Sequence, residues 1–197
     1  MKLIAVTTER FFDGEADGVT ALFEEGLERL HLRKPEAAVA EITKWLTAIP
    51  EVFHNRIVLH SHFGLTANFQ LGGTHLNRHN PLPINQKGSV SRSCHSIAEI
   101  KESYGLDYYF LSPVFDSVSK AGYRSAIDLG EVAEAFRQKA LPAEVYALGG
   151  ITPNRVQQVK QAGFAGVAVL GALWGAFPTD NNIDALITRY QLLINSK

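Results

Sequence analysis

Short apolar runs of the kind found in strands recur along the whole chain, and longer segments with helical spacing separate them. Eight such runs predict strands, at residues 3–7, 29–33, 56–60, 73–76, 88–92, 107–111, 144–148 and 166–170. The intervening segments place apolar side chains three or four positions apart, as at Val132, Ala135 and Phe136. Strands that are apolar on both faces and are joined by helices indicate a parallel sheet covered by helices.

Eight strand–helix units in 197 residues predict one α/β domain, a compact (β/α)₈ TIM barrel that covers residues 1–197. An open, doubly wound sheet would give a similar alternation, but the number of units favours a closed barrel. No linker or low-complexity stretch interrupts the pattern, and the segment 77–87 is too short to be a domain boundary.

The amino-acid composition excludes some classes of binding partner. Nineteen basic and twenty acidic residues give a net charge of −1, so we expect neither a nucleic acid nor a membrane partner. The first residues lack the basic and apolar regions of a secretory signal, which predicts a cytoplasmic protein. The single cysteine, Cys94, excludes an internal disulfide and a CxxC pair. Self-association stays open, and an exposed Trp45 or Trp174 would mark the interface.

Two glycine turns follow the last two predicted strands. Gly149 and Gly150 end the seventh, and Leu170 and Gly171 end the eighth. In a (β/α)₈ barrel the loops after these strands often bind phosphate through backbone N–H groups. We therefore predict a phosphate site at these four residues. The alternative is that the glycines only permit tight turns.

The loop after the sixth predicted strand carries two hydroxyls and a lysine, at Ser117, Ser119 and Lys120. Hydroxyl donors and a point charge can wrap a phosphate or a diphosphate. A solvated serine-rich turn would have the same composition.

The chain resembles the thiamine phosphate synthase/TenI family in six ordered blocks: HLR at 31–33, GGTHL at 72–76, SRSCHS at 91–96, DYYFLSPVFDSVSK at 107–120, ALGGITPNRV at 147–156 and GFAGVAVL at 163–170. The resemblance covers nearly the whole chain and implies a (β/α)₈ barrel that acts on a thiazole phosphate in thiamine biosynthesis. In this family the synthase joins the thiazole phosphate to a pyrimidine methyl diphosphate and releases diphosphate. The TenI branch includes thiazole tautomerases.

The resemblance also assigns roles to single residues. It places the thiazole phosphate on the same two glycine turns, and it matches the loop at 117–120 to the family's Thr-x-Thr-Lys loop. Ser93 matches a serine that faces the pyrimidine diphosphate. Arg33 and Lys34 stand where the family has Arg-x-Lys, although Pro35 replaces the second cation. His95 lies in an RSCHS segment that is similar to the TenI side.

Two departures from the family pattern bear on the reaction. Synthases carry Asn-Asp at the end of the third strand and an Asp 19 positions later, which hold Mg²⁺, whereas this chain has His60-Ser61 and Asn80. Mg²⁺ prefers anionic oxygen, so it is expected as a cofactor only if synthase activity is retained. TenI tautomerases place a histidine at the position of Pro113, which cannot titrate.

Six of the seven histidines lie between positions 54 and 95. An imidazole can take and give a proton near neutral pH, so His60 and His62, at the end of the third strand, are the candidate acid–base residues. Both can equally be polar lining residues. A His-x-His pattern can also bind Zn²⁺, but no nearby Asp or Glu completes a shell, and we assign no metal ligand.

The favoured function is that of a TenI-like thiazole tautomerase, because the Mg²⁺-binding carboxylates are replaced. The alternatives are a divergent thiamine-phosphate pyrophosphorylase and a non-catalytic regulator that binds a related phosphorylated ligand. The predicted catalytic residues are His60, His62, Ser93 and Lys120. The predicted substrate-binding residues are Arg33, Lys34, Ser61, Asn80, His95, Ser117 and Ser119.

Overall fold

The structure is a computed structural model, and it describes residues 1–77, 87–103, 105–116 and 127–196. Eight parallel strands lie within these ranges: β1 (Lys2–Val6), β2 (Arg29–Leu32), β3 (Ile57–Leu59), β4 (Gly73–Leu76), β5 (Ser89–Cys94), β6 (Tyr108–Leu111), β7 (Val145–Leu148) and β8 (Gly166–Val169). They pair in sequence order and close through the pairing of β8 with β1. The predicted (β/α)₈ barrel is confirmed, and the alternative of an open sheet is wrong.

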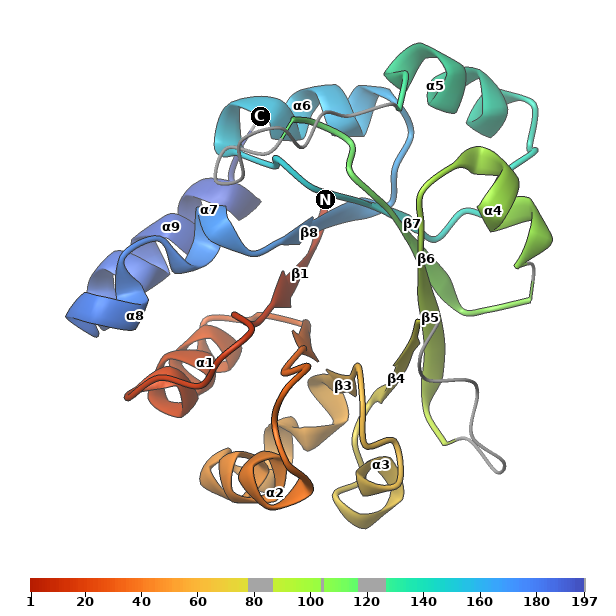
Figure 1. The fold of residues 1–197 in the computed structure, drawn as a ribbon. Coiled ribbons are helices and arrows are strands. Elements are labelled where there is room, and N and C mark those ends of the chain that lie inside the picture. The colour runs from red at the N-terminus through yellow and green to blue at the C-terminus, as the bar shows by residue number, and fades with distance from the viewer. Residues whose placement is uncertain (78–86, 104, 117–126, 197) are drawn as a thin grey trace.

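Helices surround the barrel on the outside (Figure 1). They are α1 (Glu15–Glu24), α2 (Val39–Ala48), α3 (Leu65–Asn68), α4 (Ile97–Glu102), α5 (Leu129–Arg137), α6 (Pro153–Gln161), α7 (Gly171–Trp174), α8 (Phe177–Asp180) and α9 (Ile183–Ile194), with a 3₁₀ helix, η1 (Glu51–Arg56), before β3.

Local sequence explains where several helices begin. The Ser96 hydroxyl accepts a hydrogen bond from the Glu99 N–H and caps α4. The Asp128 carboxylate caps α5 in the same way, and Asn182 caps α9. These side chains satisfy N–H groups that the first turn of a helix leaves without partners.

Alternation along the strands separates two layers of packing. In β2, Leu30 and Leu32 belong to the large core between barrel and helices, whereas the intervening His31 is buried inside the barrel. Cys94 is fully buried in that outer layer, as alternation from Ser93 predicts.

The inside of the barrel has an apolar side and a polar side. The apolar side comes from β1 and β6–β8 and consists of Ile4, Val6, Tyr108, Phe110, Tyr146 and Ala168. The polar side comes from β2, β3, β4 and β5 and includes three histidines. The barrel is therefore filled by side chains, and a ligand has to bind at one of its ends.

Neither tryptophan marks an interface. Trp45 is 7% exposed and Trp174 is 1% exposed. The Trp174 indole N–H donates to the Val6 carbonyl at 2.7 Å, which joins α7 to β1. The expectation that an exposed tryptophan would report self-association is wrong, because the outer helices cover both rings. Among the described residues, no helix is long and apolar enough to cross a membrane.

Candidate functional site

The two glycine turns lie side by side at the carboxyl ends of β7 and β8. Leu148 pairs with Ala168 in the sheet, so Gly149 and Gly150 on one strand and Gly171 on the next leave the barrel together. The backbone N–H groups of these three glycines have no hydrogen-bond acceptor among the described residues. Adjacent backbone donors of this kind are what a phosphate group requires.

The glycines differ in what the fold demands of them. Gly149 and Gly150 have left-handed φ values of +97° and +62°. A Cβ on Gly149 would lie 2.8 Å from the Cα of Pro113, and one on Gly150 would lie 2.5 Å from the Asp116 carbonyl oxygen. Gly171 is different, because a Cβ there would meet no atom of the described residues within 4 Å. Protein packing therefore explains Gly149 and Gly150, but it leaves open space beside Gly171 that a ligand can occupy.

A hydrogen-bonded chain of aromatic side chains crosses the barrel below its mouth. The Tyr108 hydroxyl lies 2.7 Å from Nε2 of His31, and Nδ1 of His31 lies 2.9 Å from Nε2 of His60. His31 is fully buried, whereas His60 is partly exposed. His60 follows the end of β3 and is therefore the histidine of this chain that lies nearer the mouth.

His75 completes a group of three imidazoles. Its ring stacks on that of His60, with centroids 4.2 Å apart, and it lies across the ring of His31 at 5.0 Å. Its two nitrogens lie 2.8 Å from the hydroxyl oxygens of Ser91 and Ser93. Ser93, predicted to face the ligand, is thus tied to the histidine group.

Burial controls the protonation of this group. Desolvation lowers the pKa of His75 to about 3, with a smaller contribution from the Arg33 guanidinium. The pKa values of His31 and His60 also lie well below the ordinary value, first because of burial and then because of the neighbouring imidazoles. All three rings are therefore neutral at pH 7, and each has one protonated nitrogen and one lone pair.

The two cations predicted after β2 are separated by the structure. Arg33 stays at the mouth and pairs with Glu9, Nη1 to Oε1 at 2.8 Å. Lys34 points into the protein instead, where its Nζ lies 2.7 Å from Oε1 of Glu15 and both side chains are at most 1% exposed. Lys34 therefore does not stand beside Arg33 as a second cation for a ligand.

His62 is directed away from the histidine group. Its backbone is left-handed, with φ +54°, and its Nε2 lies 2.9 Å from the Ala37 carbonyl oxygen. His95 is exposed and bonds to the Ser112 carbonyl oxygen at 2.8 Å. Of the two histidines proposed for acid–base work, only His60 joins the chain through the barrel.

Part of the predicted site lies outside the described residues, namely Asn80, Ser117, Ser119 and Lys120. Ser61, beside His60, is partly exposed and offers a neutral hydroxyl where the family pattern has a carboxylate. A hydroxyl beside neutral imidazoles does not suit Mg²⁺, which prefers carboxylate and carbonyl oxygen. The described residues therefore do not fit that ion.

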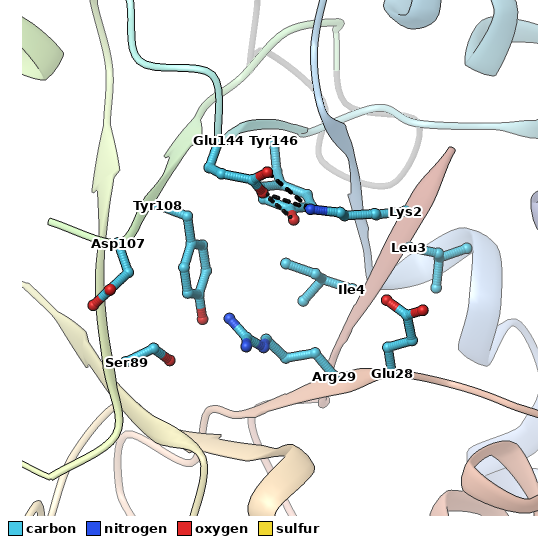
Figure 2. Close-up of a pocket in the computed structure, with 10 residues that line it drawn as sticks. All are labelled: Lys2, Leu3, Ile4, Glu28, Arg29, Ser89, Asp107, Tyr108, Glu144 and Tyr146. Atoms are coloured by element: carbon cyan, nitrogen blue, oxygen red, sulfur yellow. Dashed lines mark hydrogen bonds and ion pairs between the residues drawn. The ribbon is translucent and has the colours of Figure 1, made fainter.

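The opposite end of the barrel carries a cavity of about 300 Å³ that none of the predicted site residues lines (Figure 2). Lys2 pairs with Glu144 there at 2.8 Å, and the Arg29 guanidinium lies 4.8 Å from the centre of the Tyr108 ring. Tyr108 thus connects this floor to the histidine group.

Sequence reasoning missed His31, Tyr108 and Glu9. His31 is not among the predicted site residues, because it lies 23 positions before His54, the first residue of the histidine-rich segment. The signal that identifies it is alternation: in the run RLHLR the two leucines face the helices, so the histidine between them has to face the barrel interior. The position of Tyr108 in DYYFL follows by the same rule.

The fold and the mouth define a (β/α)₈ barrel with neutral imidazoles below its mouth and, at the carboxyl ends of the strands, backbone N–H groups that have no acceptor in the described part of the chain. The sequence model described as "Thiamine monophosphate synthase" matches residues 3–173, and the chain belongs to this family.

Individual relatives agree with this assignment. A thiamine-phosphate synthase of Latilactobacillus sakei is 29% identical over 70% of this chain and 65% of its own length. One of Salinibacter ruber is 36% identical over 58% of this chain and 47% of its own length. A crystal structure of thiamine phosphate pyrophosphorylase from Bacteroides thetaiotaomicron is 44% identical, with a TM-score of 0.88 over 98% of this chain and 96% of that one. The chain thus spans less than two thirds of the first two relatives and nearly all of the third.

Proposed function

We propose that this protein binds a thiazole phosphate at the mouth of the barrel and transfers a proton on its ring, as a thiazole tautomerase in thiamine biosynthesis. The observation that carries the proposal is the imidazole of His60 directly after β3, hydrogen-bonded to the buried His31 at 2.9 Å, beside a serine where the family has a carboxylate. A proton transfer needs a neutral group that can accept and return a proton, and it needs no diphosphate leaving group.

The buried neighbours define what His60 can do. In the tautomer that makes His60 a base, its Nε2 carries the proton and donates it to Nδ1 of His31, and Nε2 of His31 donates to the Tyr108 oxygen. Nδ1 of His60 then has a lone pair that can accept a proton from the substrate. The buried His31 and Tyr108 orient the His60 ring in this tautomer, which is the arrangement expected of a positioned acid–base group.

Ligand charge adjusts the basicity of His60. Burial and the neighbouring imidazole and guanidinium lower its pKa in the free protein. A phosphate, or a carboxylate on the thiazole, would bring negative charge to the mouth and raise that pKa again, because an opposite charge favours the imidazolium. His60 would therefore become a better base when the substrate is bound.

The phosphate would bind at the glycine turns after β7 and β8. The supporting observations are the three N–H groups that have no acceptor among the residues the structure describes, and the space beside Gly171, where no described atom lies within 4 Å of the position that a Cβ would take. The phosphate would then lie at the carboxyl ends of the strands, at the same end of the barrel as His60.

A second candidate is a thiamine-phosphate synthase, and the specific observation in its favour is the pyrophosphorylase structure that is 44% identical to this chain. This reaction would need charge stabilisation for the departing diphosphate, and Ser61 contributes no charge. The synthase is therefore the less favoured of the two functions.

One set of assays separates the candidates. The unaltered protein is incubated with carboxythiazole phosphate isomers, and in parallel with thiazole phosphate, pyrimidine methyl diphosphate and Mg²⁺. Isomer conversion that falls about 10²-fold in His60→Asn, with thiazole phosphate affinity retained, would support the tautomerase. His54→Asn is the matched control, since His54 is a buried histidine that bonds only to backbone carbonyls in the described structure.

The other outcomes of these assays would support a different function or a loss of stability. Mg²⁺-dependent thiamine phosphate formation without isomer conversion would assign the synthase. Thiazole phosphate binding without turnover in either assay would leave the non-catalytic regulator. Equal loss of activity in His60→Asn and His54→Asn would show that loss of stability, and not of proton transfer, causes the effect.

A further inference from the structure

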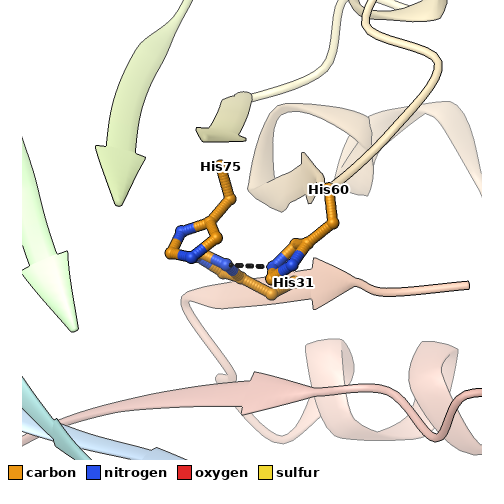
Figure 3. Close-up of side chains that lie close together, drawn as sticks. All are labelled: His31, His60 and His75. Atoms are coloured by element: carbon orange, nitrogen blue, oxygen red, sulfur yellow. Dashed lines mark hydrogen bonds between the residues drawn. The ribbon is translucent and has the colours of Figure 1, made fainter. Parts of the chain in front are cut away.

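We propose that His31, His60 and His75 form a binding site for one divalent transition-metal ion such as Zn²⁺ or Co²⁺. His31 lies in β2, His60 directly follows β3 and His75 lies in β4, and the three side chains meet inside the barrel (Figure 3). One nitrogen of each ring can be chosen so that all three lie within 4.8 Å of one another.

The donor set selects the kind of ion. Three imidazole nitrogens suit Zn²⁺, Co²⁺, Ni²⁺ or Cu²⁺, whereas Mg²⁺ and Ca²⁺ take oxygen. Burial keeps the rings neutral, so each offers a lone pair without first releasing a proton. Three histidines also leave a fourth tetrahedral position for water or another small ligand.

The outer partners of two ligands are already in place. Metal-bound histidines usually donate their second N–H to an oxygen acceptor, which fixes the tautomer and the ring orientation. If Nδ1 of His31 binds the ion, its Nε2 keeps the Tyr108 hydroxyl at 2.7 Å. Whichever nitrogen His75 gives, the other keeps a serine hydroxyl, Ser91 or Ser93, at 2.8 Å.

Modest movements would bring the rings to the ion. Nδ1 of His31 and Nε2 of His60 share one proton at 2.9 Å. Two nitrogens bound to one tetrahedral ion at about 2.0–2.1 Å are about 3.3 Å apart, so this pair has to open slightly. The His75 ring, now stacked on His60, has to turn about its Cβ–Cγ bond.

The protons balance without release. The proton on Nε2 of His60 moves to Nδ1 of the same ring, while His31 keeps its proton on Nε2 and donates it to the Tyr108 oxygen. Each of the three rings keeps one N–H, so all three ligands stay neutral and the ion retains its full charge. His60 is the least buried residue of the three and is therefore the first that an ion entering from the mouth would meet.

Metal binding and the proposed proton transfer both use the imidazole of His60. The loaded protein is therefore expected to lose tautomerase activity. The two proposals are tested independently, because metal binding is measured without substrate.

The test titrates tag-free protein, stripped with EDTA, with Co²⁺ and follows the visible absorption of the ion. We expect one Co²⁺ per chain with tetrahedral bands, displaced by one Zn²⁺. In His75→Gln the affinity should fall at least about 100-fold. Tyr108→Phe removes an outer partner but no ligand, and should weaken binding about 10- to 100-fold. The matched control His54→Asn should bind as the unaltered protein does.

Several results would overturn the site. They are no binding by folded, unaltered protein at millimolar Co²⁺, unchanged binding in His75→Gln, or a loss in His54→Asn as large as that in His75→Gln. Should the cluster variants fail to fold, X-ray absorption at the zinc edge of the unaltered protein decides. Three imidazole ligands would support the site, and fewer would exclude it.

Discussion

Replacing Lys34 by methionine tests whether this lysine stabilises the fold or binds ligand. Its Nζ contacts Oε1 of Glu15 at 2.7 Å and the Arg10 carbonyl oxygen at 2.8 Å, and neither charged side chain is more than 1% exposed. Lys34→Met would leave the Glu15 carboxylate buried without its counter-charge.

The expected cost is large because the remaining charge cannot reach water. Removing one partner of a buried ion pair typically costs about 3–5 kcal/mol of the free energy of unfolding. Replacing both partners, as in Glu15→Leu with Lys34→Met, removes the unpaired charge and is expected to cost much less than the single change. The two single variants and the double variant form a cycle that measures the pair itself.

The pH dependence has a defined sign. Burial already raises the pKa of Glu15 above its ordinary value, and the charge of Lys34 partly opposes this. In Lys34→Met the opposing contribution is gone, so the folded-state pKa rises further above the unfolded value of 4.5. The penalty is therefore full above the folded pKa, and it shrinks as the pH falls toward 4.5, by up to about 1.36 kcal/mol per pH unit.

Urea unfolding at pH 7.5 and pH 5 measures these changes, and calorimetry with thiazole phosphate measures binding. We expect Lys34→Met to be destabilised by several kcal/mol at pH 7.5 and less at pH 5, with ligand affinity unchanged. A cost below about 1 kcal/mol, a cost that grows on acidification, or a specific loss of ligand affinity would refute the structural role of Lys34.

Two further predictions concern the mouth of the barrel. Gly171→Val should weaken thiazole phosphate binding at least tenfold, about 1.4 kcal/mol. Little change in melting temperature is expected, because a Cβ at Gly171 meets no atom of the described residues within 4 Å. Unchanged calorimetric affinity would remove Gly171 from the phosphate site. Ser61→Asp combined with Asn80→Asp should raise Mg²⁺ affinity and any synthase turnover, because the two carboxylates supply anionic oxygen. Robust Mg²⁺-dependent formation of thiamine phosphate by the unaltered protein would show that these carboxylates are not needed.

The sequence by itself determined the order and the approximate bounds of all eight strands. Each strand is a short apolar run, and such a run can be identified from neighbouring residues alone. It also determined that Cys94 faces the helices, since period-two alternation fixes the side of each strand residue. The adjacency of the turns at Gly149 and Gly171 followed from the topology of the barrel.

Tertiary structure decided which polar residues meet. The parallel pairing of β2 with β3 brings His31 against His60, 29 positions away in the sequence, and curling of the sheet into a barrel brings Tyr108 of β6 within 2.7 Å of His31. Lys34 is buried only because α1 places Glu15, 19 positions earlier, against it. Local patterns report the side of a strand on which a residue lies. Which charges are paired, and which imidazoles share a proton, depends on neighbours that only the closed barrel supplies.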